Sequence, residues 1–469
     1  MSTQKFSIKN YIAIIAILTV LVMTVLDVTL VNVALPVLAT KFGVADSTAV
    51  WLVTIYQMII TMLLLPVSSI GDKFSYRKCF LSGVVIFTVA SACCAASQSF
   101  MMLVASRALQ GIGAACVMGV NIALTRIIYP REVLGRGLAL NAMVIAISTA
   151  AGPTIAGAVM SVASWHWLFL INVPFGIFAF ILGKRLLPQN PQKGRKGKFD
   201  WISALENAAT FGLIFYAMGS LARNGEYGLN SGLLVAGVII GFFYLRRELH
   251  SNTPMLPVDL FRIKLYSLSI CTSISSFIAQ IVAMVSLPFL LMGNFHFSEI
   301  STGLLMTPWP LATMIVSPLA ARFIEKHNPG ATAAVGMAVF SAGLLMLLFS
   351  PEAPHEWEIA WRMAICGIGF GLFQTPNNIV MVLATPIERT GSAGGMQSTA
   401  RLIGQTMGAT LVTLIFAIFN SNGNSVSVCL MVAISFAIIA GLFSLCRTAG
   451  INDRRNNTAS ISDESEQKD

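Results

Sequence analysis

The chain has 469 residues, of which 56% are hydrophobic and only 11% are charged, and its formal net charge is +10. Charged residues occupy roughly a quarter of the positions in an ordinary soluble protein. This composition excludes a water-soluble globular protein and predicts that lipid surrounds most of the chain.

Fourteen apolar runs follow one another along the chain, most of them near the roughly 20 residues that a helix needs to cross a bilayer. The first run follows Lys5 and Lys9 and is too long for the core of a signal peptide, so we expect it to be retained as a helix. The eighth run is the shortest and gives the weakest signal. In chain order the runs are Tyr11–Leu35, Thr48–Ile70, Cys79–Ala96, Phe100–Ile127, Val133–Val162, Trp165–Leu187, Trp201–Leu221, Ser231–Leu245, Ser267–Met292, Ser301–Ala321, Ala331–Ser350, Glu358–Ala384, Gly391–Asn420 and Ser425–Cys446.

Lysine and arginine are distributed unevenly between the two ends of these predicted helices. With a cytoplasmic N-terminus, the cytoplasmic segments carry 25 of the 30 basic residues, including Arg447 directly after the last run, whereas the outer loops carry only Lys41 and Arg223. The other three lie within predicted helices: Arg107, Arg362 and Arg401. Since cytoplasmic loops are enriched in lysine and arginine, both termini are expected in the cytoplasm. The net charge then reflects orientation and indicates no nucleic-acid partner.

The spacing of the runs predicts four blocks. Residues 1–187 form a bundle of six helices, residues 188–264 hold a basic linker and a two-helix hairpin, and residues 265–448 form a second bundle of six. Residues 449–469 form a polar cytoplasmic tail that we expect to be disordered. The expected fold class is all-α and integral to the membrane.

Motifs for other kinds of chemistry are missing from the sequence. No phosphate-binding loop of the type Gly-x4-Gly-Lys-Ser/Thr occurs, which excludes an ATP-driven motor in this chain. Gly111–Gly113 and Gly367–Gly369 lie within spanning runs, where they indicate close packing of helices. The histidines and cysteines have no metal-binding spacing, and no nucleophile–base pair is found. We therefore expect no enzymatic activity, no metal and no cofactor, and an ion gradient as the energy source for uphill transport.

Two ionisable residues lie at similar depths within predicted helices. Asp27 is roughly 24 Å from the cytoplasmic end of the first run, and Arg107 is roughly 10 Å below the outer face in the fourth. Charges inside a bilayer are costly and mark functional sites. A carboxylate there can take up a proton or meet a cationic substrate, and a nearby arginine tunes its charge. The alternative is a structural pair that only orders the bundle.

Several segments resemble signatures of the fourteen-helix drug:proton antiporters of the major facilitator superfamily, and together they cover essentially the whole chain. Leu26–Pro36 (LDVTLVNVALP) resembles the signature of helix 1, and Arg107–Gly113 (RALQGIG) resembles the helix 4 motif whose arginine is implicated in proton coupling. Gly152–Gly157 (GPTIAG) resembles the antiporter motif of helix 5. Trp165–Pro174 (WHWLFLINVP) resembles the start of helix 6. Gln374–Asn378 and the segment around Arg401 are also similar to the family.

This resemblance implies two six-helix bundles with an inserted hairpin, 14 transmembrane helices in all, in the cytoplasmic membrane of a bacterium. It implies a proton-coupled exporter of hydrophobic or cationic drugs that works by alternating access. Asp27 and Arg107 would couple transport to protons, so that the proton gradient stands in place of a cofactor. Lipid, protons and a small lipophilic substrate are the expected partners, and the transporter is expected to be a monomer.

The loop after the second run departs from the family pattern. Two family glycines are replaced by Ser68 and Ser75, whereas the charges of Asp72, Lys73 and Arg77 are kept. In the family this loop acts as a cytoplasmic latch between the bundles, and Asp72 could interact with the positive end of a facing helix. The serines leave open how tightly the backbone packs. The alternative is an ordinary basic loop.

The antiporter motif also has a physical interpretation of its own. Pro153 removes a helix hydrogen bond and bends the chain, and Gly152 and Gly157 let neighbouring helices approach closely. A rigid, tightly packed bend there could block leakage and favour exchange. A packing kink without a transport role is the alternative.

Polar residues on the predicted helices are candidates for lining a substrate cavity, although hydrogen bonding between helices is the alternative for each. These candidates are Asn32, Gln57, Gln110, Asn121, Gln280, Gln374, Asn377 and Arg401. Because Arg107 and Arg401 outnumber the one deep acid, export of an anionic metabolite stays open as a second hypothesis. A membrane scaffold without transport is the third.

Overall fold

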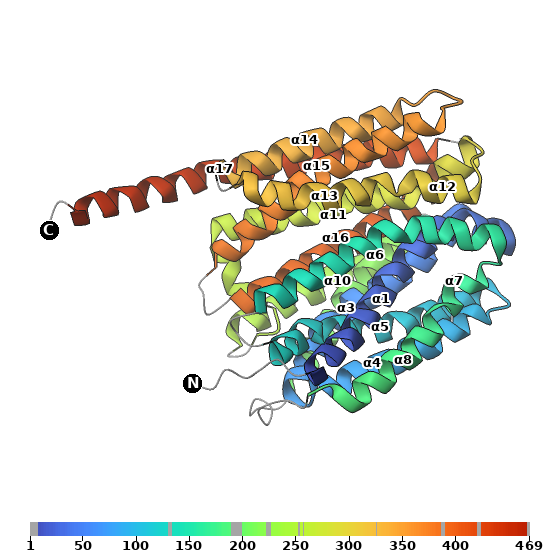
Figure 1. The fold of residues 1–469 in the computed structure, drawn as a ribbon, viewed down its shortest axis with the longest axis horizontal. Coiled ribbons are helices and arrows are strands. Elements are labelled where there is room, and N and C mark those ends of the chain that lie inside the picture. Colours follow the sequence, from blue (N-terminus) through green and yellow to red (C-terminus); the bar gives the residue numbers. More distant parts are fainter. Residues whose placement is uncertain are drawn as a thin grey trace. The chain divides into compact units, whose positions relative to one another are not determined.

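The computed structural model consists of helices throughout the residues that it describes (Figure 1). These are all residues except 1–7, 130–133, 189–198, 222–226, 252–253, 257, 325, 386–389, 420–423 and 467–469. Helices are the expected solution for this chain, because hydrocarbon offers no hydrogen-bond partner and each spanning segment must satisfy its own backbone groups.

The first half of the chain forms six long helical segments, two of which are interrupted by a single residue. The interruptions at Val50 and Ile171 leave short helices, α2 and α7, in front of α3 and α8. The helices are α1 (Ile8–Phe42), α2 (Asp46–Ala49), α3 (Trp51–Lys73), α4 (Tyr76–Ala95), α5 (Phe100–Ile128), α6 (Leu134–Val162), α7 (His166–Leu170) and α8 (Asn172–Leu186).

A helical hairpin and six further segments follow. A π-helical turn over Leu290–Asn294 extends α11, and Thr307 separates α12 from α13. The helices are α9 (Trp201–Ser220), α10 (Tyr227–His250), α11 (Lys264–Phe289), α12 (Glu299–Met306), α13 (Pro308–Phe323), α14 (Pro329–Leu348), α15 (Glu356–Leu383), α16 (Thr390–Phe419) and α17 (Ser425–Glu466).

Twelve segments in the described part of the chain are both long and apolar enough to cross a membrane. Two more, α9 with 20 residues and α15 with 28, are long enough but more polar. Glu206 and Asn207 reduce the hydropathy of α9, and Arg362 and Gln374 reduce that of α15. The run at 231–245 is the weakest in the sequence, yet it lies within the 24-residue helix α10, which is one of the twelve. Its flanks are helical as well and supply the missing length.

The chain divides into two compact units. The first comprises Met1–Leu256, Met284–Thr307 and Ala409–Val426, and the second comprises Pro257–Ala283, Pro308–Gly408 and Ser427–Asp469. The hairpin α9–α10 thus belongs to the first unit. The domain boundaries expected at residues 187 and 264 stay predictions.

Glycine allows close helix contact at equivalent places in both units. In the first unit, a Cβ atom on Gly113 of α5 would lie 2.5 Å from the backbone nitrogen of Phe87 in α4. In the second, a Cβ atom on Gly369 of α15 would lie 2.3 Å from the backbone nitrogen of Phe340 in α14. Both distances are too short for any side chain. The prediction that Gly111–Gly113 and Gly367–Gly369 are packing sites is confirmed.

The last helix, α17, extends to Glu466 and includes most of the polar C-terminal segment. Composition predicts disorder for this segment. A helix without an apolar stripe gains little from packing, so the disorder in solution stays a prediction.

We predict that Gly113→Ala lowers the melting temperature of the purified protein. The added methyl group would meet the backbone of α4, and overpacking of this kind costs about 1–3 kcal/mol. Gly232→Ala on α10 is the matched control, because a Cβ atom there meets nothing within 4 Å. Thermal unfolding in detergent measures both variants, and equal melting temperatures would contradict the close packing of α4 and α5.

Candidate functional site

The first unit contains a fully buried ion pair between its first and fourth spanning segments. Asp27 of α1 and Arg107 of α5 are both 0% exposed. The Nη1 group of Arg107 donates to Oδ2 of Asp27. The similar depths calculated from the sequence are thus matched by direct contact in the structure.

Two amide side chains complete the surroundings of the Asp27 carboxylate. Gln110 lies one turn after Arg107 on α5, and its Nε2 group donates to Oδ1 of Asp27 at 2.7 Å. Asn172, the first residue of α8, donates from Nδ2 to the same oxygen at 3.2 Å. Gln110 is itself held by Arg107, which donates to Oε1 at 2.5 Å, and by Ser91 of α4 at 2.9 Å. Helices α1, α4, α5 and α8 therefore meet at one carboxylate.

Arg107 is also fixed by the second spanning segment. Its Nε group donates to the backbone carbonyl of Leu52 at 3.1 Å, and its guanidinium carbon lies 4.2 Å from the ring centroid of Tyr56. Such a cation–π contact stabilises an arginine that water cannot reach. Nη2 of Arg107 and the hydroxyl of Tyr56 are both buried without a hydrogen-bond partner among the described residues. These two groups are free to bond when the cluster rearranges.

All the side chains that bond Asp27 are hydrogen-bond donors, which suits an ionised carboxylate. Burying two charges is expensive, and removing one member of a buried pair costs roughly 3–5 kcal/mol because the other is left uncompensated. Protonation of Asp27 would remove its negative charge and so weaken the hydrogen bonds that it accepts from Arg107, Gln110 and Asn172.

The helix that carries the antiporter motif packs tightly on two neighbours. A Cβ atom on Gly152 of α6 would lie 1.9 Å from Oγ1 of Thr29 in α1, two residues from Asp27. On the other side, a Cβ atom on Gly303 of α12 would lie 2.3 Å from the carbonyl oxygen of Pro153. One on Gly157 would lie 2.6 Å from the carbonyl oxygen of Glu299. The bend at Pro153 is thus closely packed from both sides.

The charged loop after α3 is organised within the first unit. Asp72 accepts a hydrogen bond from the hydroxyl of Tyr76 at 2.7 Å, and Arg77 donates to the carbonyl oxygen of Lys184 near the end of α8. Lys73 lies 5.8 Å from the ring centroid of Phe199. Ser75 caps α4 by accepting from the backbone nitrogen of Lys78. This cap explains why a serine stands at position 75 in place of the family glycine. The latch role of Asp72 stays a prediction.

The other polar candidates of the first unit do not join the Asp27 cluster. Asn32, Gln57 and Asn121 are 6%, 2% and 8% exposed, and the side-chain oxygen of each has no hydrogen-bond partner among the described residues. Buried amide oxygens without partners are uncommon. The role of these three residues in lining a substrate cavity stays a prediction.

The second unit contains a buried cluster around Arg447 of α17, which is 1% exposed. Arg447 donates to Oδ1 of Asn377 and to the hydroxyl of Ser269 at 3.0 Å. Asn377 in turn donates to the hydroxyl of Ser273 at 2.7 Å. Arg447 directly follows the last predicted run and is buried rather than solvated, because acceptors on α11, α15 and α17 itself bond its guanidinium inside the unit; its position on the cytoplasmic side stays a prediction. Ser444 lies three residues earlier on the same helix and accepts a hydrogen bond from Arg447 at 2.8 Å. A polar residue at this spacing was the signal in the sequence that Arg447 is bonded within the helix.

Gln280, Gln374 and Arg401, the remaining candidates of the second unit, are all partly buried. Arg401 lies on α16 and has no hydrogen bond or ion pair with any other described residue. Three residues further along the same helix, a Cβ atom on Gly404 would lie 2.6 Å from the carbonyl oxygen of Ile274 in α11. Arg401 is thus an unpaired cation on a closely packed helix.

No group of three metal-ligating side chains occurs in the described part of the chain. The chemistry available at the Asp27 cluster is transfer of a proton and rearrangement of hydrogen bonds. A profile of the Major Facilitator Superfamily matches residues 17–286 and 268–465. The chain belongs to the major facilitator superfamily. Both the family and the all-helical membrane fold expected from the sequence are confirmed.

Two relatives and one solved structure illustrate the similarity within the superfamily. The uncharacterized transporter YebQ of Escherichia coli (strain K12) is 48% identical over 93% of this chain and 95% of its own. The multidrug efflux pump LfrA of Mycolicibacterium smegmatis is 28% identical over 83% of this chain and 77% of its own. The crystal structure of a POT family transporter with a thioalcohol-conjugated peptide has a TM-score of 0.71 at 15% identity, covering 93% and 96% of the two chains. This last likeness concerns the fold.

We predict strong thermodynamic coupling between Asp27 and Arg107. Asp27→Asn and Arg107→Gln should each lower the melting temperature, since each leaves a buried charge without its partner, at a cost of roughly 3–5 kcal/mol. The double variant should melt well above the value expected from adding the two effects. Thermal unfolding in detergent at pH 8 provides the measurement.

The matched control is the exposed pair of Asp200 and Arg247, whose side chains are 38% and 39% exposed. Exposed pairs contribute about 0–1 kcal/mol. Coupling between Asp27 and Arg107 as small as that of the control pair would contradict the compensation described above.

Proposed function

We propose that this member of the superfamily is a proton-coupled antiporter that exports hydrophobic or cationic compounds from the bacterial cytoplasm. Both termini lie in the cytoplasm, and the transporter alternates between inward-open and outward-open states around a central site. The proton gradient supplies the energy, and Asp27 exchanges a proton for substrate.

The observation that carries this proposal is the donor-only environment of the buried Asp27 carboxylate. An acid that orders a bundle needs one partner, whereas Asp27 has three donors from two helices: Arg107, Gln110 and Asn172. Protonation disturbs all three hydrogen bonds at once and so changes the contacts that hold α1, α5 and α8 together. A two-state element of this kind is what proton-driven alternation requires.

Arg107 is the second residue that takes part in the proposed exchange. When Asp27 is neutral, the guanidinium keeps its bond to Leu52 and its contact with Tyr56, and the cluster retains a positive charge. A cationic or hydrophobic substrate is then bound in the deprotonated state and released in the protonated one. The name of the multidrug efflux pump LfrA, a relative over 83% of this chain, supports such a substrate class.

We predict that Asp27→Asn abolishes efflux driven by a pH gradient, because asparagine cannot exchange a proton. The measurement is transport of ethidium, a lipophilic cation, in proteoliposomes with an imposed gradient. Asp46→Asn, at the start of α2 and away from the cluster, is the control and should transport at the wild-type rate. Efflux at the wild-type rate by Asp27→Asn would refute the proposed role.

Arg401 favours a second candidate function, the export of an anionic metabolite. A partly buried cation that has no acidic partner among the described residues can bind the charged group of an anion. If this function is correct, Arg401→Gln lowers transport of the anion carboxyfluorescein at least fivefold, Arg401→Lys restores part of it, and ethidium transport is unchanged. Loss of ethidium transport alone would instead favour the first function.

A further inference from the structure

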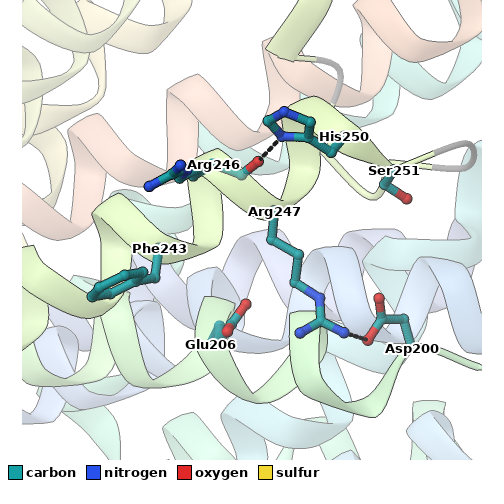
Figure 2. A pocket seen from close by; sticks show the side chains of 7 residues that line it. All are labelled: Asp200, Glu206, Phe243, Arg246, Arg247, His250 and Ser251. Carbon is teal, nitrogen blue, oxygen red and sulfur yellow. Dashed lines mark hydrogen bonds and ion pairs between the residues drawn. The ribbon is translucent and has the colours of Figure 1, made fainter.

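A charged pocket lies between the two helices of the inserted hairpin. Its volume is about 570 Å³, and it opens between the first turns of α9 and the last turns of α10 (Figure 2). None of its residues belongs to the Asp27 cluster. The lining residues are Asp200, Glu206, Phe243, Arg246, Arg247, His250 and Ser251.

One wall of the pocket carries positive charge. Arg246 is exposed, and Arg247, which is 39% exposed, reaches across from α10 to Asp200 with a separation of 3.4 Å (Figure 2). Nδ1 of His250 donates a hydrogen bond to the carbonyl oxygen of Arg246 at 2.7 Å, which holds the imidazole against the end of α10. Two guanidinium groups on one helix end can bind a phosphate group.

The opposite wall carries two carboxylates from α9. Asp200 caps the helix by accepting from the backbone nitrogens of Ile202 at 3.1 Å and Ser203 at 3.0 Å. Partial burial by itself would raise the pKa of Asp200, but the hydrogen bonds from Ser203 and the charge of Arg247 outweigh it and lower the pKa. The carboxylate is therefore ionised at neutral pH.

Glu206 is the second carboxylate, and it has an unsatisfied oxygen. Its Oε2 atom is buried and has no hydrogen-bond partner among the residues that the structure describes. A buried acceptor without a partner is costly, more so when it is charged. Figure 2 shows the Glu206 side chain directed from α9 toward the space below α10 that the pocket occupies. A cationic group in the pocket would lie beside this carboxylate and that of Asp200.

From the length and composition of α10, we expect the pocket to lie where a bilayer changes from hydrocarbon to headgroups. It is at the end of α10, which is long and apolar enough to span the membrane. The apolar side chains around it are exposed, including Trp201 at 68%, Leu205 at 71% and Phe243 at 55%. Tryptophan is enriched at this depth of the membrane. These side chains form a surface for acyl chains directly beside the charged pocket.

We propose that the hairpin pocket binds the phosphoethanolamine headgroup of an aminophospholipid. The phosphate is held by Arg246 and Arg247, and the ammonium is held by Glu206 with Asp200. An anionic headgroup alone would satisfy the arginines but would bring its charge close to two carboxylates. A choline headgroup carries no N–H group and cannot donate to Glu206. With the cytoplasmic termini of the proposed function, the bound lipid belongs to the inner leaflet.

The test is native mass spectrometry of the full-length purified protein with dioleoyl lipids added in detergent. Phosphatidylethanolamine should bind roughly tenfold more tightly than phosphatidylcholine, as expected for one charge-assisted hydrogen bond. The singly and doubly N-methylated lipids should fall between them. This series uses the wild-type protein, so its result does not depend on the folding of a variant. Equal affinity across the series would overturn the proposal.

Variants then locate the site. Glu206→Gln should abolish the preference for phosphatidylethanolamine over phosphatidylcholine, and Arg246→Gln should weaken binding of both lipids. Arg185→Gln, at the exposed end of α8, and Glu352→Gln, in the loop before α15, are the controls and should bind as the wild type does. An unchanged preference in Glu206→Gln would overturn the assignment of the ammonium site.

Two further ligands distinguish a lipid site from other phosphate chemistry. Tighter binding of phosphatidylglycerol than of phosphatidylethanolamine would make the pocket an anionic-lipid site and contradict the proposal. Displacement of the lipid by millimolar inorganic phosphate would make it a site for free phosphate and would also contradict it. The proposal requires that neither occurs. Ethidium transport by Asp27→Asn is a separate measurement, so failure of one proposal leaves the other intact.

Discussion

The ion pair between Asp27 and Arg107 determines how the first unit is built, because hydrocarbon can solvate neither charge. Each charge must find its partners on neighbouring helices, and the partners must be fixed in turn. Gln110 is therefore tied to Ser91, and Arg107 is tied to the backbone of Leu52. The result is a cluster in which one buried ion pair joins several helices.

The second unit also buries a cation, but the side chains that bond this cation are neutral. Arg447 is buried among neutral acceptors, chiefly Asn377 and Ser269, on the first, fourth and sixth spanning segments of that half of the chain. The Asp27 cluster uses the first, fourth and sixth segments of the other half. The two clusters differ in what a proton can do to them: the amides and hydroxyls around Arg447 have no proton to exchange near neutral pH. Of these two buried clusters, only that of Asp27 contains a carboxyl group, which is why the proposed proton coupling is assigned to it.

Much of the fold could be predicted from the sequence because a bilayer imposes length and composition on each helix. The proximity of Asp27 and Arg107 was also predictable, since charges at equal depth have few other partners. Asn172 was not, because an amide at the break between α7 and α8 is drawn to the carboxylate by three-dimensional packing that spacing does not encode. The burial of Arg447 was not predictable for a related reason. It lies one residue beyond an apolar run, where the sequence cannot tell a buried cation from a solvated one.

The contact between Gly152 and Thr29 has a mechanical consequence. Thr29 occupies the space that the missing side chain of Gly152 leaves, and it lies on the same turn of α1 as Asp27. A displacement of α1 large enough to uncover the carboxylate must also withdraw Thr29 from α6, which is held on its other side by α12. Under the proposed antiport mechanism, access of protons to Asp27 and loosening of the contact between α1 and α6 would therefore occur in one movement. Such a geometry would act as an interlock that prevents ions from crossing the protein without a complete transport cycle.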